Sequence, residues 1–75
     1  MEKRVVQINK VPVELYKILK FENIVASGGE AKYLIADGHV KVNGGVETRK
    51  RKKIYPGDII ETMGYLLEIH ELELH

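Results

Sequence analysis

The stretch that decides the fold is SGGEAKYLIADGHVKVNG, residues 27–44. It opens with the S-x-x-E pattern of a helix capping box, from Ser27 to Glu30. Apolar residues then recur with the spacing of one helix face. They are Ala31, Leu34 and Ile35. After Gly38 the period changes to two, and Asn43-Gly44 is the strongest short hairpin signal. The stretch therefore predicts a helix over 28–37 followed directly by a β-hairpin.

Toward the N-terminus, a second helical pattern precedes this stretch. Its apolar residues also recur at three- and four-residue spacing, which predicts a helix over 13–21. They are Leu15, Ile18 and Leu19. We expect Pro12 in the first turn of this helix and Phe21 in the core at its end. Arg4 to Ile8 fits an edge strand.

Toward the C-terminus, the pattern indicates only short strands and turns. Strands are expected over 46–48, 54–55, 59–62 and 65–72, with turns at Pro56-Gly57-Asp58 and at Gly64. The predicted fold class is α+β, with two packed helices (13–21 and 28–37) followed by a small twisted antiparallel sheet. Residues 1–75 are predicted to form a single domain.

Composition excludes several classes of protein. The chain has 75 residues, of which 44% are hydrophobic and 31% charged, so we expect a folded domain too small for a deep catalytic pocket. It has no cysteine, no apolar run of membrane-spanning length and no signal-peptide pattern. His39, His70 and His75 are too dispersed for a metal motif. We therefore expect a cytoplasmic protein that is not an enzyme and has no cofactor, no small-molecule substrate and no membrane partner.

The near-neutral net charge of +1 conceals a segregation. Residues 1–53 hold all 12 Lys and Arg against six acidic residues, whereas residues 54–75 hold five acidic residues and no Lys or Arg. Five of the basic residues form one run, Arg49-Lys50-Arg51-Lys52-Lys53. This pattern indicates a polyanionic partner. The alternative is a solvated surface on which the acidic C-terminal part neutralises the run.

Several of these motifs occur together, in one order, in a known family. The motifs are Ser27 before the second helix, Gly38-His39-Val40-Lys41-Val42-Asn43-Gly44, and Tyr55-Pro56-Gly57-Asp58-Ile59-Ile60. In this order the chain resembles the S-four RNA-binding domain, or alpha-L motif, as found in ribosomal small-subunit protein S-four. Leu19-Lys20, residues 27–32 and Glu47-Thr48-Arg49 resemble its short stand-alone bacterial members. The resemblance is strongest over residues 5–63.

The resemblance implies an alpha-L fold that binds structured RNA. Larger members carry Arg at the start of the first helix and just after the Ser of the second, where this chain has Val13-Glu14 and Gly28-Gly29. Other cations and backbone amides can take their place. The candidate RNA-binding residues are Lys17, Lys20, Gly28, Gly29, Lys32, Lys41, Asn43, Arg49, Lys50, Arg51, Lys52 and Lys53.

The residue types suggest how such a surface would work. Amides at Gly28 and Gly29 would seat a phosphate at the positive end of the second helix. The alternative is that these glycines only permit a tight helix entry. Lys32, Lys41 and the 49–53 run would then extend one positive surface, although Asn43 fits a turn better than an RNA contact. The tyrosines are scattered and form no paired stacking platform, and Tyr33 is expected to pack against the protein.

The function predicted from sequence is a non-catalytic RNA-binding module for rRNA or tRNA, in ribosome assembly or quality control. We expect a monomer whose partners include the ribosome. Two alternatives stay open. A double-stranded DNA binder fits the spacing of the two helices, but Gly-Gly-Glu offers no base-reading side chains at the second helix start. A protein-interaction adaptor would use the charge segregation to pair chains head to tail.

Overall fold

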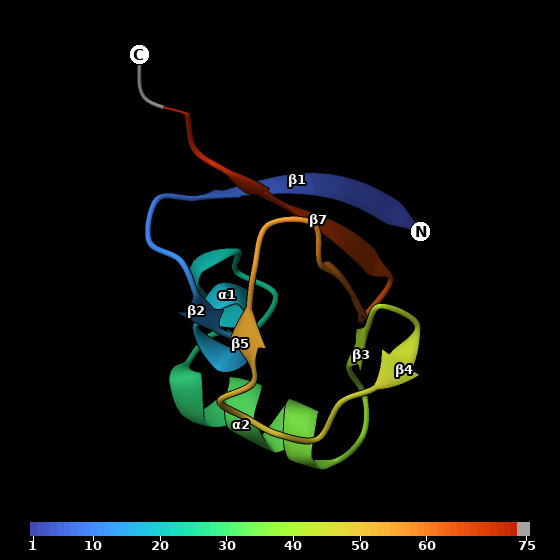
Figure 1. The fold of residues 1–75 in the computed structure, drawn as a ribbon. Helices are drawn as coiled ribbons and strands as arrows, with labels where there is room; N and C mark the ends of the chain where they lie inside the picture. Colours follow the sequence, from blue (N-terminus) through green and yellow to red (C-terminus); the bar gives the residue numbers. More distant parts are fainter. Residues whose placement is uncertain (74–75) are drawn as a thin grey trace.

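The structure is a computed structural model that describes residues 1–73 and places two packed helices beside a five-stranded sheet (Figure 1). The elements are β1 Glu2–Ile8, β2 Val13–Glu14, α1 Leu15–Phe21, α2 Gly28–Ala36, β3 Lys41–Val42, β4 Gly45–Val46, β5 Lys53–Ile54, β6 Ile59–Thr62 and β7 Tyr65–Glu71. The five-stranded sheet has the order β1-β7-β6-β3-β4, and β2 pairs with β5 in a second small sheet. The predicted α+β class and both helices are confirmed.

The main sheet is not wholly antiparallel, which corrects the prediction. The edge strand β1 runs parallel to β7, with Val6 opposite Ile69, whereas the remaining pairs are antiparallel. The two strands cross the top of the molecule together (Figure 1). Alternation along a strand shows which side chains face the core but not which strand lies next to it. The sequence pattern therefore could not predict that β1 runs parallel to β7.

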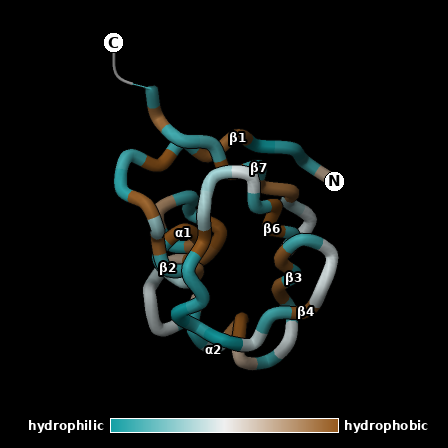
Figure 2. The backbone as a smooth tube through the Cα atoms, viewed as in Figure 1, coloured by the Kyte–Doolittle hydropathy of each residue, from teal (hydrophilic) through white to brown (hydrophobic). Residues whose placement is uncertain are grey.

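The core lies between the helices and the sheet. Apolar residues of both helices meet apolar residues of the strands there (Figure 2). Its buried members are Val6, Ile8, Leu15, Ile18, Leu19, Val25, Ala31, Ile35, Val40, Ile54, Ile60, Leu67 and Ile69. All three apolar residues that predicted the first helix are buried, as are Ala31 and Ile35 of the second.

Both ends of α2 are closed as the sequence predicts. The Ser27 hydroxyl accepts a hydrogen bond from the Glu30 amide at 3.1 Å, and the Glu30 carboxylate accepts one from the Ala26 amide at 3.3 Å. At the other end Gly38 has a φ of +83°, which permits its amide and that of His39 to donate to the carbonyls of Ile35 and Leu34. This is a Schellman motif.

α1 begins two residues later than predicted. Val13 and Glu14 pair with Ile54 and Lys53 in the β2–β5 sheet, so the chain is extended there and turns helical only at Leu15. Pro12 consequently lies in the connection between β1 and β2, not in the helix. The partner strand is distant in sequence, which is why helical spacing alone placed the start too early.

Two aromatic residues expected to pack are exposed instead. Phe21, the last residue of α1, is 67% exposed, and Tyr33 of α2 is 74% exposed. After Phe21 the chain reverses at Asn23, whose φ is +57°, and Ile24 and Val25 then pack on the core. These aliphatic residues take the position that was predicted for Phe21.

One side chain connects the two turn motifs. The Asn43 carboxamide donates to the Asp58 carboxylate at 3.0 Å and accepts from the Ile59 amide at 2.9 Å. Asn43 and Gly44 both have positive φ, as the inner residues of a type I′ hairpin turn require. The Asp58 carboxylate also accepts from the Tyr55 amide at 2.8 Å. The Asn-Gly and Pro-Gly-Asp motifs are therefore parts of one hydrogen-bonded unit.

The run at residues 49–53, hereafter the basic segment, is held by backbone hydrogen bonds. The Leu15 amide donates to the Lys52 carbonyl at 2.9 Å, and the Tyr16 amide donates to the Lys50 carbonyl at 3.2 Å. These amides are the first two of α1, whose N-cap residue, Glu14, provides no side-chain cap. The basic segment therefore caps α1 and is fixed in place by doing so.

At its entrance the basic segment is fixed by an ion pair. The Arg49 guanidinium donates to both carboxylate oxygens of Glu47, at 2.9 and 3.0 Å. This hydrogen bond, followed by one from the Arg49 amide, lowers the pKa of Glu47 from 4.5 to about 2.

Ser27→Ala is expected to lower the free energy of unfolding by about 1 kcal/mol, since the Glu30 amide loses its acceptor. Urea denaturation measures this loss. Ser27→Thr is the control, because a Thr hydroxyl can also cap. Unchanged stability together with lost RNA affinity would contradict the capping role and make Ser27 a ligand group.

Glu47→Gln is expected to lower stability at neutral pH and to flatten the acid side of the stability profile. Because folding lowers the pKa of Glu47, its contribution is fully present above pH 4.5 and is lost as the pH falls toward about 2. The measurement is the urea unfolding free energy across this window. Arg49→Gln removes the other partner and should give the same flatter profile. A Gln variant as acid-sensitive as the wild type would contradict this account.

Candidate nucleic-acid interface

Tyr16 joins three parts of the candidate surface. The Lys32 ammonium lies 4.6 Å from the centre of its ring, and the Lys17 ammonium lies 6.0 Å away. The ring also lies beside Gly28, close enough that a Cβ there would be 3.7 Å from it. Since the Tyr16 amide binds the Lys50 carbonyl, this residue links α1, the start of α2 and the basic segment. Tyr16 could not be predicted as a site residue from the sequence, because its role depends on contacts between distant segments.

The start of α2 presents two amides that are open to a ligand. Within residues 1–73 the amides of Gly28 and Gly29 have no hydrogen-bond partner, whereas the Glu30 amide donates to the Ser27 hydroxyl. The Glu30 carboxylate is turned back toward Ala26. Amides at the N-terminus of a helix favour anions, so these two glycines are placed as a phosphate seat requires.

The basic segment borders a hollow of about 440 Å³, hereafter the basic hollow. Its lining residues are Arg49, Arg51, Lys52, Lys53 and Tyr55. None of these is acidic, and Tyr55 is 48% exposed. In Figure 2 the connection from β4 to β5 appears as a hydrophilic stretch that passes in front of α2. The hollow therefore combines four cations with one accessible aromatic ring.

The cations of this region are only partly neutralised within the protein. Arg49 pairs with Glu47, whose hydrogen bond raises the pKa of Arg49, and the Arg51 guanidinium lies 3.6 Å from Glu14. Lys17 also pairs with Glu14, at 3.4 Å. In the described part of the chain, Lys32, Lys50, Lys52 and Lys53 form no ion pair. These lysines are available to an anionic partner.

The ion pairs that the basic segment forms within residues 1–73 involve acidic residues from the N-terminal side of the chain. The acidic partners of the segment are Glu47 and Glu14, which both precede it. Asp58 holds the turn at Pro56-Gly57, and Glu68 pairs with His70. The described ion pairs of the basic segment are thus formed with residues that precede it in the chain.

Two candidate residues have other surroundings. Lys41 is opposite Glu61 in the β3–β6 register, and both line a different hollow. Asn43 uses its carboxamide to hold the two turn motifs together. The structure brings together Lys17, Gly28, Lys32 and the basic segment. Lys20 is exposed on the last turn of α1, and no described contact joins it to this group.

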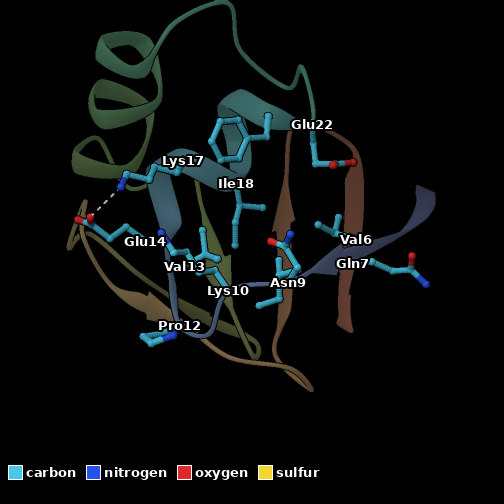
Figure 3. A pocket seen from close by; sticks show the side chains of 12 residues that line it. Val6, Gln7, Asn9, Lys10, Pro12, Val13, Glu14, Lys17, Ile18 and Glu22 are labelled. Atoms are coloured by element: carbon cyan, nitrogen blue, oxygen red, sulfur yellow. Dashed lines mark ion pairs between the residues drawn. The ribbon is translucent and has the colours of Figure 1, made fainter. Parts of the chain in front are cut away.

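A second groove, between β1 and α1, has a different character (Figure 3). It measures about 390 Å³, and Val6, Val13 and Ile18 contribute apolar surface to it. Glu14 and Glu22 also line it, the former in its ion pair with Lys17. Its two carboxylates offset the two lysines that also line it, Lys10 and Lys17, so this groove lacks the excess of positive charge that the basic hollow has.

The described residues provide no metal site. Within residues 1–73 no three His, Asp or Glu side chains are grouped so that they could hold a metal ion, and His75 lies outside the described part. His39 is exposed and bonds to Asp37 at 2.9 Å. Neither α1 nor α2 has the length and apolar character needed to cross a bilayer.

Similar proteins place the chain in a family. A family model of the S4 domain matches residues 6–70. The chain is 47% identical to "Putative RNA-binding protein YbcJ" of Escherichia coli (strain K12) over 57 residues, which cover 76% of this chain and 81% of that protein. It is 32% identical over 60 residues to "Probable ribosome maturation protein RlbA" of Bacillus subtilis (strain 168), which covers 80% and 84% of the two chains.

A solved structure agrees with these matches. The solution structure of YbcJ from E. coli, described as containing an alfaL motif involved in RNA-binding, superposes with a TM-score of 0.68 at 43% identity, over 88% of this chain and 85% of that one. The resemblance inferred from the sequence motifs is confirmed. Because the family model spans most of the sequence and the relatives match over most of their length, the chain belongs to the S4 domain family.

Proposed function

We propose that this protein is a non-catalytic module that binds structured RNA, rRNA or tRNA, during ribosome assembly or quality control in the cytoplasm. The single observation that carries the proposal is the placement of the basic segment. Its backbone is fixed on the N-terminus of α1, while Lys50, Lys52 and Lys53 form no ion pair within residues 1–73. A preformed array of unpaired cations suits a polyanion, because few side chains need to be ordered on binding.

The neighbouring residues support RNA. Gly28 and the Lys32 ammonium lie beside the Tyr16 ring, next to the basic segment, and the open amide of Gly29 follows that of Gly28 in the chain. Such a surface offers backbone amides and point charges, which suit the phosphates and shape of a folded RNA. The names of the relatives also support RNA binding, since one is called a putative RNA-binding protein and another a probable ribosome maturation protein.

DNA recognition is the competing possibility and has less support. A recognition helix reads bases with side chains near its N-terminus, where α2 has Gly28, Gly29 and a Glu30 that is engaged in capping. Titration of a structured RNA and of a duplex DNA of equal length, at two salt concentrations, compares the two. Tighter binding of the RNA at both concentrations is expected. Equal binding of both would contradict the RNA preference.

Replacing Lys50, Lys52 and Lys53 with Gln is expected to weaken binding to unrelated structured RNAs while preserving the fold. Each phosphate contact contributes roughly 0.7 to 0.9 to the slope of log K against log salt, so the loss of three should flatten it by roughly 2 to 3 units. The carbonyls of Lys50 and Lys52, which cap α1, are unchanged by the substitution. The measurement is RNA affinity across a salt series, with circular dichroism as a check of folding.

Lys3→Gln combined with Lys10→Gln is the control for this variant. Both lysines are exposed, lie outside the basic segment and form no ion pair within residues 1–73. The control should keep the wild-type slope. If instead the control loses slope and the basic-segment variant does not, RNA binds elsewhere on the protein and the proposed surface is wrong.

Lys32→Glu is expected to lower RNA affinity by about tenfold at low salt, because a contact with phosphate becomes a repulsion of more than about 1 kcal/mol. Lys32→Gln should give an intermediate loss. Lys41→Glu is the positional control, since Lys41 lies in a different hollow beside Glu61. A Lys41→Glu loss as large as that of Lys32→Glu would contradict the grouping around Tyr16.

A further inference from the structure

The basic hollow contains a feature that the binding of a regular RNA helix leaves unused. Tyr55 is 48% exposed and stands among Arg49, Arg51, Lys52 and Lys53. A regular helix keeps its bases stacked inside and offers phosphates and ribose hydroxyls to a protein. Cations alone would satisfy those groups. The aromatic ring requires a different explanation.

The Tyr55 ring carries no cation in the described part of the chain. Tyr16, by contrast, has two lysines near its ring, and Tyr65 has the Arg4 guanidinium 4.8 Å from its centre. Four cations nevertheless line the same hollow as Tyr55. The ring is not part of the core, whose adjoining member is Ile54. Tyr55 is thus a half-exposed aromatic residue in a positively charged setting.

The position of Tyr55 is fixed from both sides. Ile54 is fully buried in β5, and the Tyr55 amide donates to the Asp58 carboxylate at 2.8 Å. The Tyr55 carbonyl accepts from the Asp58 amide at 3.1 Å across the Pro56-Gly57 turn, where Gly57 has a φ of +97°. Little backbone ordering would therefore accompany binding at this ring, which favours affinity.

The other wall of the hollow is also preformed. The Lys52 carbonyl accepts from the Leu15 amide, and the Lys52 amide donates to the Arg49 carbonyl at 3.2 Å. Lys52 and Lys53 form no ion pair within the described residues, so their ammonium groups can approach phosphates on either side of a base. An aromatic ring flanked by free cations is the arrangement by which proteins hold single-stranded nucleic acid.

We propose that the basic hollow binds one unpaired nucleotide of the RNA, with its base stacked on Tyr55 and its flanking phosphates held by Lys52 and Lys53. This inference rests on the proposed function and makes it more specific. The preferred RNA is a helix interrupted by a bulge or ended by an overhang, so that Lys17, Lys32 and the glycines of α2 hold the helical part. Stacking on an aromatic ring tolerates every base, so the site selects an unpaired position and not a sequence.

The test compares two hairpin RNAs that differ only by one bulged nucleotide, in which the bulged base is the fluorescent analogue 2-aminopurine. The wild type is expected to bind the bulged RNA at least about fivefold more tightly, the lower end of what one stacked base contributes. Binding should quench the 2-aminopurine fluorescence. Tyr55→Leu should abolish both the preference and the quenching and keep the affinity for the unbulged hairpin. Tyr55→Phe retains the ring and should behave as the wild type.

Tyr33→Leu is the matched control, because Tyr33 is a more exposed tyrosine outside the hollow. It should retain the preference for the bulged RNA. Equal affinity of the wild type for both hairpins would overturn this inference and leave the proposed function standing. The same holds if Tyr55→Leu weakens both complexes equally. Failure of the wild type to bind either RNA would overturn the proposed function as well.

Discussion

The capping of α1 by the basic segment is the interaction on which the rest of the surface depends. Glu14 provides no side-chain cap, so the first amides of this helix need acceptors from elsewhere. The carbonyls of Lys50 and Lys52 provide them. The same two hydrogen bonds stabilise a helix whose apolar face is in the core and keep a segment of five like charges in a single conformation. Without them the repelling side chains would have little reason to stay together. The same hydrogen bonds therefore determine both the stability of α1 and the position of the basic side chains.

Most of the fold was predictable because its signals are local. Ser27 and Glu30 cap one helix, Gly38 ends it, and Asn43-Gly44 turns the chain, all through neighbouring residues. The errors have a common cause, which is dependence on a distant partner. Val13 and Glu14 are extended because they pair with β5. β1 pairs in parallel with β7, which lies at the other end of the sequence. Phe21 is exposed, and Ile24 and Val25, which follow the chain reversal at Asn23, pack on the core instead.

The candidate site was predicted less completely than the fold. The run of cations identified the basic segment, and helical periodicity placed Lys32 outside the apolar stripe of the second helix. These signals could not identify which of these cations have internal partners, such as Arg49 with Glu47. Nor could they identify the two tyrosines that organise the surface. Lys17 of α1 and Lys32 of α2 both lie near the Tyr16 ring, and Tyr55 lines the basic hollow. A single tyrosine forms no sequence motif, and its role depends on the chain segments that pack near it in the fold.

The hydrogen bonds of Asn43 with Asp58 and Ile59 have a consequence for how such a module can change. They join the two ends of the segment from residue 44 to residue 57, so this segment begins and ends at one closed base. Residues added at Thr48 would lengthen an exposed connection without displacing a buried side chain, but they would separate Glu47 from Arg49 and break the ion pair between them. The segment is thus a natural place for grafting new contacts. A designer could alter what this protein recognises there while the helices and sheet stay as they are.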